Sequence, residues 1–202
     1  MAKKNGEAPV FVDSSIIAKN IERFEQYFKN KGFFNTHVEV KKRLLPNQKG
    51  IVQYLIQTDN QYTIESIREE INSPALDSLY NLSFKNRLIK KGDPFNINTF
   101  EAERNRLINY FRNNGVYNFQ QNNIQFTAAI DSSGIDTKIP VLVEISNLQK
   151  RENDTLKKVQ YQIHKVKEIN LYIDSASKLT QNTVFTDSIT YKDFKVFYKE
   201  KL

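Results

Sequence analysis

The side chains that most often carry chemistry are few and scattered in this chain. Its two histidines, His37 and His164, lie in different segments, and neither belongs to an H-x-x-x-H or H-x-H pattern. There is no cysteine, which excludes disulfides, thiolate metal sites and cysteine nucleophiles. The serines at 14–15 and 132–133 lie in cap and turn sequences that lack the Gly-x-Ser-x-Gly pattern of a catalytic serine. We therefore expect no metal and no other cofactor.

Acid/base pairs and phosphate loops are equally poorly supported. Glu69–Glu70 are adjacent, and Glu101 and Glu103 alternate; neither spacing brings two carboxylates together on a helix. No glycine-rich loop precedes a helix. Lys31-Gly32-Phe33 begins like an RNA-recognition-motif signature, but Phe34 follows where Gly or Ala is needed. The sequence predicts that this protein is not an enzyme.

The formal net charge of +7 fits either a lysine-rich solvated surface or contact with an acidic partner or an anionic lipid surface. It also leaves open an alternative function, a basic ferredoxin-like nucleic-acid-binding module. Steeply salt-dependent binding to single strands would identify such a module. No apolar run approaches the roughly 18 to 20 residues of a membrane helix, and the first residues lack the apolar core of a signal peptide.

The structural elements are organised around a stretch that occurs twice. Residues 23–35 and 106–118 align without gaps, and such a repeat indicates one supersecondary unit used more than once. Each copy predicts an amphipathic helix that ends at a left-handed glycine, Gly32 or Gly115. The identical pairs are Arg23 and Arg106, Tyr27 and Tyr110, Phe28 and Phe111, Asn30 and Asn113, Gly32 and Gly115, and Asn35 and Asn118.

The rest of the pattern divides the chain into three units. Residues 1–58 contain the first helix and a hairpin of alternating strands, and residues 59–148 read β-α-α-β-β. Residues 149–202 begin a third unit. Its first residues belong to a charged, aperiodic stretch at 148–158, which predicts a linker or long turn, and Val159 then opens a strand.

The second unit shows the clearest start and stop signals. We expect a strand from Tyr62, a short helix started by Ser73–Pro74, and a longer helix capped by Asn98 or Thr99. Two alternating strands follow, and the sheet is expected to be small and antiparallel. The residues predicted to form its core are Phe100, Leu107, Phe111, Ile124, Phe126, Val141, Val143 and Ile145.

This unit resembles a POTRA (polypeptide-transport-associated) domain of the BamA/TamA family of outer-membrane assembly proteins. The motif positions are Gly92, Pro94, Phe95, Arg106, Leu107, Phe111, Gly115 and Tyr117, with Gly32 as the counterpart of Gly115 in the first copy. Residues 7–58 resemble the second half of an earlier domain, and the lead-in at 6–15 is similar to the TamA-like branch. The resemblance implies an α+β fold of tandem small domains, each a three-stranded sheet with two helices on one face. On this view the first domain is truncated at its N-terminus and the third at its C-terminus.

In function, the resemblance implies the periplasmic region of an outer-membrane protein assembly or translocation factor, attached to the outer membrane through a C-terminal barrel absent from this sequence. Such regions bind and guide unfolded β-barrel precursors or passengers, and scaffold other assembly-complex subunits, by strand addition rather than catalysis. Anionic lipid headgroups are a further partner compatible with the charge. Nucleic acid is not expected as a partner on this view.

The resemblance also places the middle strand of the chain order at an edge of each sheet. In the first unit, Thr36–Arg43 carries the charges of Lys41, Lys42 and Arg43, which fit a protected edge. In the second, the strand within Asn122–Ile130 has no charge, and it is the candidate client-binding edge; a plain edge or a domain–domain contact are its alternatives. Its candidate residues are Ile124, Gln125, Phe126, Thr127, Ala128, Ala129 and Ile130.

Overall fold

The structure is a computed structural model that describes residues 13–46, 49–131, 133–173, 185 and 187–198. It contains helices and several small sheets, so the chain is an α+β protein, as predicted. Its contacts divide it into two compact units, Met1–Gln162 and Ile163–Leu202, and each is described by itself. Among the described residues, no helix has the length and apolar character needed to span a membrane.

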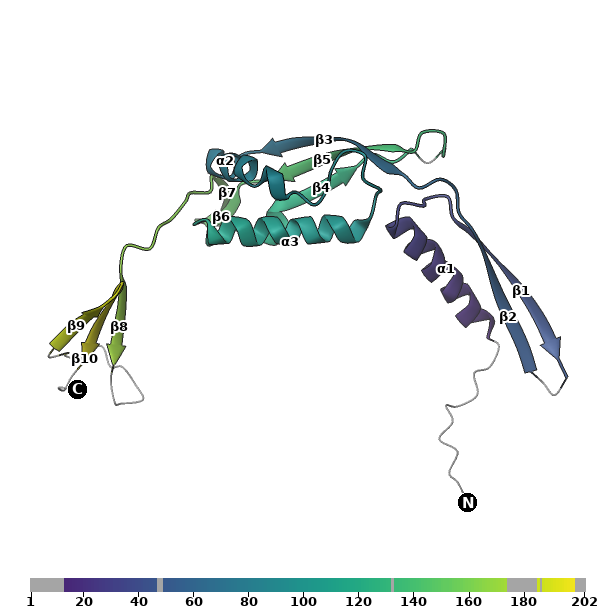
Figure 1. The fold of residues 1–202 in the computed structure, drawn as a ribbon, viewed down its shortest axis with the longest axis horizontal. Coiled ribbons are helices and arrows are strands. Elements are labelled where there is room, and N and C mark those ends of the chain that lie inside the picture. Colours follow the sequence, from purple (N-terminus) through teal and green to yellow (C-terminus); the bar gives the residue numbers. More distant parts are fainter. Residues whose placement is uncertain (1–12, 47–48, 132, 174–184, 186, 199–202) are drawn as a thin grey trace, which may run out of the picture. The chain divides into compact units, whose positions relative to one another are not determined.

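The first elements of the unit Met1–Gln162 are a helix and a β-hairpin packed together (Figure 1). They are α1 (Ser14–Asn30), β1 (His37–Leu45) and β2 (Lys49–Gln57). The side chain of Asp13 caps α1 by accepting a hydrogen bond from the Ser15 N–H at 2.7 Å. The strands pair antiparallel, and the ring of Phe24 on α1 lies 5.2 Å from that of Tyr54 on β2. The predicted helix and hairpin are confirmed.

The central elements follow the predicted order β-α-α-β-β. They are β3 (Thr63–Ile71), α2 (Pro74–Leu82), the 3-10 turn η1 (Phe84–Asn86), α3 (Ile97–Asn113), the 3-10 turn η2 (Gln121–Asn123), β4 (Ile124–Ala128) and β5 (Lys138–Ile145). The strand order is β3-β5-β4. Strand β5 runs parallel to β3 and antiparallel to β4, so the expectation of a purely antiparallel sheet was wrong. The parallel pair is possible because both helices and β4 lie in the long connection between its strands.

One face of this sheet is covered by the helices, and α3 lies along it in Figure 1. Alternate residues of β5 are buried, from Ile139 to Ile145, whereas those between them are exposed or partly buried. The residues predicted for the core are all buried except Phe126, which is partly buried. Tyr62, Ile89 and Phe119 are also in this core, although the pattern did not reveal them. Each fully buried side chain of this size contributes about 1.5–3 kcal/mol, so this core holds helices and sheet together.

The two copies of the repeated helix end in the same way. The N–H of each glycine, Gly32 or Gly115, bonds to the carbonyl three residues earlier, and the next N–H bonds to the carbonyl five residues before it. These bonds are 2.9–3.3 Å long and form a Schellman motif. The φ angles of the two glycines are +87° and +94°, which a residue with a Cβ rarely adopts. The predicted glycine stops are confirmed.

The start of the second copy differs from the prediction. Helix α3 is capped by Asn96, whose side chain accepts a hydrogen bond from the Asn98 N–H at 3.1 Å. The predicted caps, Asn98 and Thr99, are therefore inside the first turn. Asn96 prevails because it is the first of the three polar residues and already has extended backbone angles.

Residues 148–159 form a β-hairpin where the sequence predicted a linker or long turn. Strands β6 (Leu148–Glu152) and β7 (Thr155–Val159) pair antiparallel. The residues between them, Asn153 and Asp154, have φ angles of +46° and +61°, as a two-residue type I′ turn requires. The pattern failed here because nearly every side chain of this hairpin is exposed, so no apolar alternation marks its strands.

Tyr161 belongs to the core of this unit and does not begin a new one. Its ring lies 5.1 Å from that of Phe119, and its hydroxyl donates to the Asn123 side chain at 3.2 Å. Its N–H donates at 2.9 Å to the hydroxyl of Ser73, which stands at the start of α2 as predicted but makes no cap bond. The prediction that a strand begins at Val159 was wrong, because residues 160–168 have no regular secondary structure.

The unit Ile163–Leu202 contains strands β8 (Ile169–Ile173), β9 (Asp187–Tyr191) and β10 (Phe194–Tyr198). Their order is β8-β10-β9, with β10 parallel to β8 and antiparallel to β9. This repeats the order and directions of β3-β5-β4.

The sequence predicted one strand from Thr190 to Lys199 where the structure has two, because a turn with Lys192 at φ +53° intervenes. Most of the polar loop predicted at 175–188 lies outside the described residues, and the unit boundaries at 58 and 148 stay predictions.

The loop after α1 makes close contact with the start of the central sheet. The Gly32 carbonyl accepts a hydrogen bond from the Tyr62 N–H at 2.9 Å. The ring of Phe34 lies 5.0 Å from Tyr62 and 5.3 Å from Phe95. A Cβ placed on Gly32 would lie 2.8 Å from the Phe95 carbonyl oxygen. This glycine is therefore required both by its backbone angles and by the space available.

Candidate functional site

Strand β4 lies at an edge of the central sheet, as the resemblance implied, and part of its backbone is free to pair. Just beyond its two ends, the Asn123 carbonyl accepts from the Ser146 N–H at 2.9 Å and the Ala129 N–H donates to the Pro140 carbonyl at 3.3 Å. Bonded and non-bonded residues alternate along an antiparallel pair, so the odd-numbered positions of β4 bond to β5. The N–H and C=O groups that face the open edge are those of Ile124, Phe126 and Ala128.

The side chains of β4 divide between the two faces of the sheet. Phe126 is partly buried on the helix side, where its ring lies 5.4 Å from that of Phe100. The guanidinium of Arg104, on α3, lies 5.4 Å from the Phe126 ring centre and pairs with Glu101. A cavity of about 540 Å³ opens beside Arg104 and Ile124. The edge is thus uncharged along the strand and bordered by one paired cation.

The candidate strand is shorter than the sequence suggested. Strand β4 ends at Ala128, so Ala129 and Ile130 lie after it, at the start of a loop. In this loop Asp131 accepts hydrogen bonds from the Ser133 hydroxyl at 2.6 Å and from two backbone N–H groups, those of Ser133 and Asp136. These bonds, first among them the one from the Ser133 hydroxyl, lower the pKa of the Asp131 carboxyl. The loop therefore has its own hydrogen bonds and does not extend the pairing edge.

The opposite edge of the sheet is β3, and only its first part is covered. The Gly92 N–H donates to the Ile64 carbonyl at 2.7 Å, and the Phe95 N–H donates to the Tyr62 carbonyl at 2.8 Å. Beyond Ile64, no described strand pairs with this edge. Near the end of β3 the Asn72 N–H donates to the β5 residue Ile145 at 3.1 Å, and every second residue of a strand bonds to the same neighbour. The outward-facing groups are then those of Ile67, Glu69 and Ile71.

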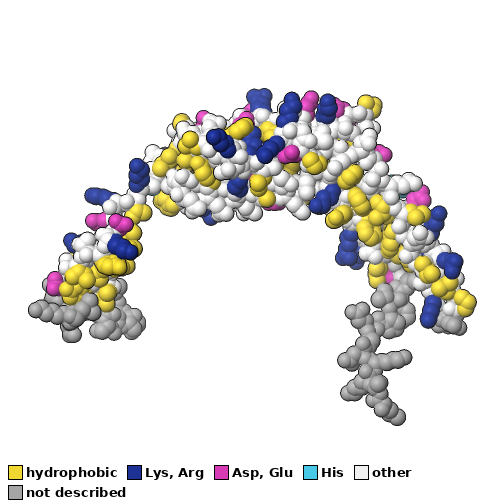
Figure 2. Space-filling view, viewed as in Figure 1, with side chains coloured by type: hydrophobic (Ala, Val, Ile, Leu, Met, Phe, Trp, Pro, Cys, Tyr) yellow, Lys and Arg dark blue, Asp and Glu magenta, His cyan; other side chains and the backbone are white. Residues whose placement is uncertain are grey.

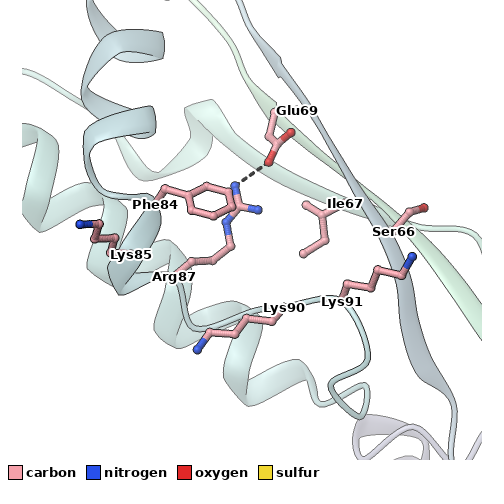
Figure 3. Close-up of a pocket in the computed structure, with 8 residues that line it drawn as sticks. All are labelled: Ser66, Ile67, Glu69, Phe84, Lys85, Arg87, Lys90 and Lys91. Carbon is pink, nitrogen blue, oxygen red and sulfur yellow. Dashed lines mark hydrogen bonds and ion pairs between the residues drawn. The ribbon is translucent and has the colours of Figure 1, made fainter.

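A cavity of about 800 Å³ lies beside this open part of β3 (Figure 3). Ser66, Ile67 and Glu69 come from β3, and the segment between α2 and α3 forms the rest of the lining. Across it, Arg87 makes an ion pair with Glu69 at 2.5 Å and donates a hydrogen bond to the Tyr80 hydroxyl at 2.6 Å. The Arg87 guanidinium also lies 4.5 Å from the centre of the Phe84 ring, which covers it in Figure 3. Burial raises the pKa of Tyr80 to about 12, so its hydroxyl stays neutral.

A buried ion pair within α3 is hydrogen-bonded to the same segment. Glu103 is 1% exposed and accepts two hydrogen bonds from the Arg106 guanidinium, at 2.8 and 2.7 Å. It also accepts from the Leu88 N–H at 3.0 Å. The hydrogen bonds from Arg106 to Glu103 raise the pKa of that arginine. Arg106 therefore has a structural part in holding the wall of the cavity.

The other motif positions are structural or exposed. Gly92 has a φ of +89°, and Phe95, Leu107 and Phe111 are buried. Pro94 makes an isolated antiparallel bridge to Thr63. Tyr117 is 67% exposed.

Among the residues that the structure describes, no catalytic set comes together. The carboxylates considered from sequence do not converge, since Glu69 and Glu103 are each held by a different arginine. Within the described ranges there is no cluster of three or more potential metal ligands. The i,i+3 spacing of Glu103 and Arg106 could have indicated their ion pair, whereas no sequence signal marked Arg87 or the cavity beside β3.

Charge and apolar surface are distributed differently over the unit Met1–Gln162. On the face shown in Figure 2, Lys and Arg side chains are interspersed with Asp and Glu, and hydrophobic side chains gather over α1 and its hairpin. Lys41, Lys42 and Arg43 of β1 are exposed, as the prediction of a charge-protected edge requires. On this face the positive side chains are therefore mixed with negative ones and do not form a single basic patch.

Comparison with known proteins gives matches among solved structures only. No known protein family and no curated protein matches the sequence. A structure of BamA from Haemophilus ducreyi lacking POTRA domains 1–3 is similar over 72% of this chain and 25% of its own, with 11% identity and a TM-score of 0.42. The POTRA3–5 region of Haemophilus influenzae BamA is similar over 81% of this chain and 57% of its own, with 12% identity and a TM-score of 0.39. This chain thus spans about a quarter of the first protein and little more than half of the second.

Proposed function

We propose that this chain is a POTRA-type binding region that holds extended segments of other polypeptides by strand addition to β4. On this proposal it acts without catalysis, in the periplasm, as part of a protein attached to the outer membrane. Its clients are unfolded β-barrel precursors or passengers, and other subunits of an assembly complex share the scaffold. The motif residues between Gly92 and Tyr117 support this assignment.

The observation that carries the proposal is the uncharged open edge of β4. Edge strands are commonly protected by lysine, proline or a bulge, and the sequence Ile-Gln-Phe-Thr-Ala of β4 contains no lysine or proline. Each backbone hydrogen bond to an added strand contributes about 0.5–1.5 kcal/mol net. Association itself costs about 4 kcal/mol or more. The backbone alone thus gives weak, nearly sequence-independent binding, which suits a carrier that must release many clients.

The direct test replaces Ala128 by proline. Because the Ala128 N–H faces the open edge, Ala128→Pro removes one donor for an added strand and leaves the ladder to β5 intact. The matched control is Ala128→Val, which keeps the N–H and adds a side chain similar in size to that of proline. The probe is a short capped peptide copied from a strand of an outer-membrane barrel, titrated against the isotope-labelled chain by NMR. We expect Ala128→Pro to weaken binding roughly tenfold or more and Ala128→Val to leave it within about threefold.

The binding mode has a second signature in the peptide. An added strand uses every second amide to pair with β4, so N-methylation of one alternate set should abolish binding and methylation of the other should not. Shifted resonances should centre on Ile124, Phe126 and Ala128. If both methylated peptides bind alike, or Ala128→Pro binds like the parent chain, strand addition at β4 is refuted.

A further inference from the structure

We propose that the open edge of β3 is a second and separate peptide site, which takes an extended acidic segment of a partner protein over the cavity beside it. This goes beyond the function proposed above, because it adds a different edge of the sheet and a partner defined by its charge. Three observations carry it: the unpaired backbone of β3, the apolar surface next to it, and the cations around that surface.

The backbone of β3 offers a pairing surface that the other described residues leave open. The segment 92–95 covers β3 only as far as Ile64, and the hydrogen-bonding groups of Ile67, Glu69 and Ile71 point outward beyond it. A strand added there continues the sheet past the point where the chain's own covering segment turns away. Its side chains would alternate between the two faces, so every second one would point toward the cavity.

The cavity offers apolar contact at the same place. Its volume of about 800 Å³ is within the usual range of ligand pockets, about 300–1,000 Å³. Ile67 forms part of its lining, and Phe84 is 57% exposed although its ring lies on Arg87. Leu88, in the same segment, is also exposed. An apolar residue of the added strand would cover this surface.

The cations around the cavity determine the charge of the partner. Lys85, Lys90 and Lys91 belong to its lining and are exposed, and in the described part of the chain none of them makes an ion pair. The one carboxylate in the lining, Glu69, is already held by Arg87. Figure 3 shows Lys91 extended toward Ser66 along β3. The complement of this arrangement is a segment with carboxylate side chains next to its apolar residue.

A peptide fits these features better than an anionic membrane surface. Lipid headgroups would use the lysines but leave the outward N–H and C=O groups of β3 unpaired. An acidic strand uses the lysines, the apolar lining and the β3 backbone together. Because the lysines are exposed, their contribution is screened by salt, and the affinity should fall from low to physiological ionic strength.

The experiment titrates the full chain with two capped strand peptides that differ only in having Glu or Gln at the cavity-facing positions beside a central Leu. We expect the Glu peptide to bind roughly tenfold more tightly than the Gln peptide. The double substitution Lys90→Glu with Lys91→Glu should remove that preference. Its charge-matched control, Lys41→Glu with Lys42→Glu on β1, should retain it. Resonances of Ile67 to Ile71 should shift on binding.

Methylated peptides and vesicles separate the alternatives. N-methylation of one alternate set of amides in the Glu peptide should abolish binding, while methylation of the other set leaves it unchanged. Equal binding of both methylated peptides would mean attraction by charge alone and would overturn the proposal. The proposal would also be overturned if anionic vesicles shifted the resonances of residues 85–91 and the Glu peptide did not. Ala128→Pro should leave this binding intact, so failure at β4 and failure at β3 can be told apart.

Discussion

Two glycines with nearly the same φ angle can separate the effect of a left-handed φ from the effect of a close contact. Gly32 and Gly92 have φ angles of +87° and +89°. A Cβ on Gly32 would lie 2.8 Å from the Phe95 carbonyl oxygen and 3.4 Å from that of Tyr62, whereas a Cβ on Gly92 would meet nothing within 4 Å. We therefore predict that Gly32→Ala destabilises the unit Met1–Gln162 more than Gly92→Ala does.

The magnitudes follow from the two effects. The left-handed conformation costs an L-residue about 1–2 kcal/mol, and alanine recovers about 0.4–1 kcal/mol by restricting the unfolded chain. Gly92→Ala should thus lower the free energy of unfolding by about 1 kcal/mol. Gly32→Ala has the same two contributions and adds overpacking against a backbone oxygen that cannot rotate away, typically about 1–3 kcal/mol. Its total should be about 2–4 kcal/mol.

Urea unfolding of the two variants, followed by circular dichroism, measures both changes. A local readout is the hydrogen exchange of the Tyr62 amide, which donates to the Gly32 carbonyl. It should lose protection in Gly32→Ala and keep it in Gly92→Ala. Equal destabilisation by the two substitutions, with the Tyr62 amide protected in both, would refute the contact between this loop and the central sheet.

Three further predictions concern the buried ion pair, the Tyr80 hydroxyl and the nucleic-acid alternative. Glu103→Gln should lower the free energy of unfolding by about 3–5 kcal/mol, because it breaks a buried pair with Arg106, whereas Glu101→Gln, whose carboxylate is half exposed, should change it by less than about 1 kcal/mol; equal effects in denaturant titrations would contradict this. Tyr80 should ionise near pH 12, so its contribution to stability is complete below pH 10 and is lost as the pH rises toward 12. Phenolate absorbance should accordingly lose its latest step in Tyr80→Phe, and an unchanged titration would disprove the assignment. Single-stranded oligonucleotides added to the chain should not bind it, even at low salt. An affinity that falls steeply with salt would favour the nucleic-acid alternative.

The parts of the fold that the sequence predicted are those encoded locally. The glycine stop at Gly115 depends on one residue type and a few neighbouring bonds, so its repeat at Gly32 could be recognised directly. The buried strand of residues 138–145 was equally clear, because its alternation records which side faces the helices. By contrast, the hairpin at 148–159 has no buried face to impose a pattern.

The parts that the sequence missed depend on contacts between distant segments. Tyr161 lies in the stretch that the sequence assigned to a third unit, but its position is decided by contacts with Phe119 and Ser73. The backbone groups that face outward on β3 and β4 depend on the register with β5, which no local pattern contains. The cavity beside β3 likewise depends on the ion pair between Arg87 and Glu69, which come from different segments.

The order of the strands in the chain has a consequence for how this sheet assembles during synthesis. Strand β5 lies between β3 and β4 but is the last of the three to leave the ribosome. Until residues 138–145 are synthesised, neither β3 nor β4 has its partner strand. For β3 this interval includes the synthesis of both helices. Such long-range pairing slows folding and leaves apolar strands exposed to aggregation meanwhile. A chaperone that shields β3 and β4 during this interval would act on the same two strands whose edges, that of β3 only beyond Ile64, stay open after folding.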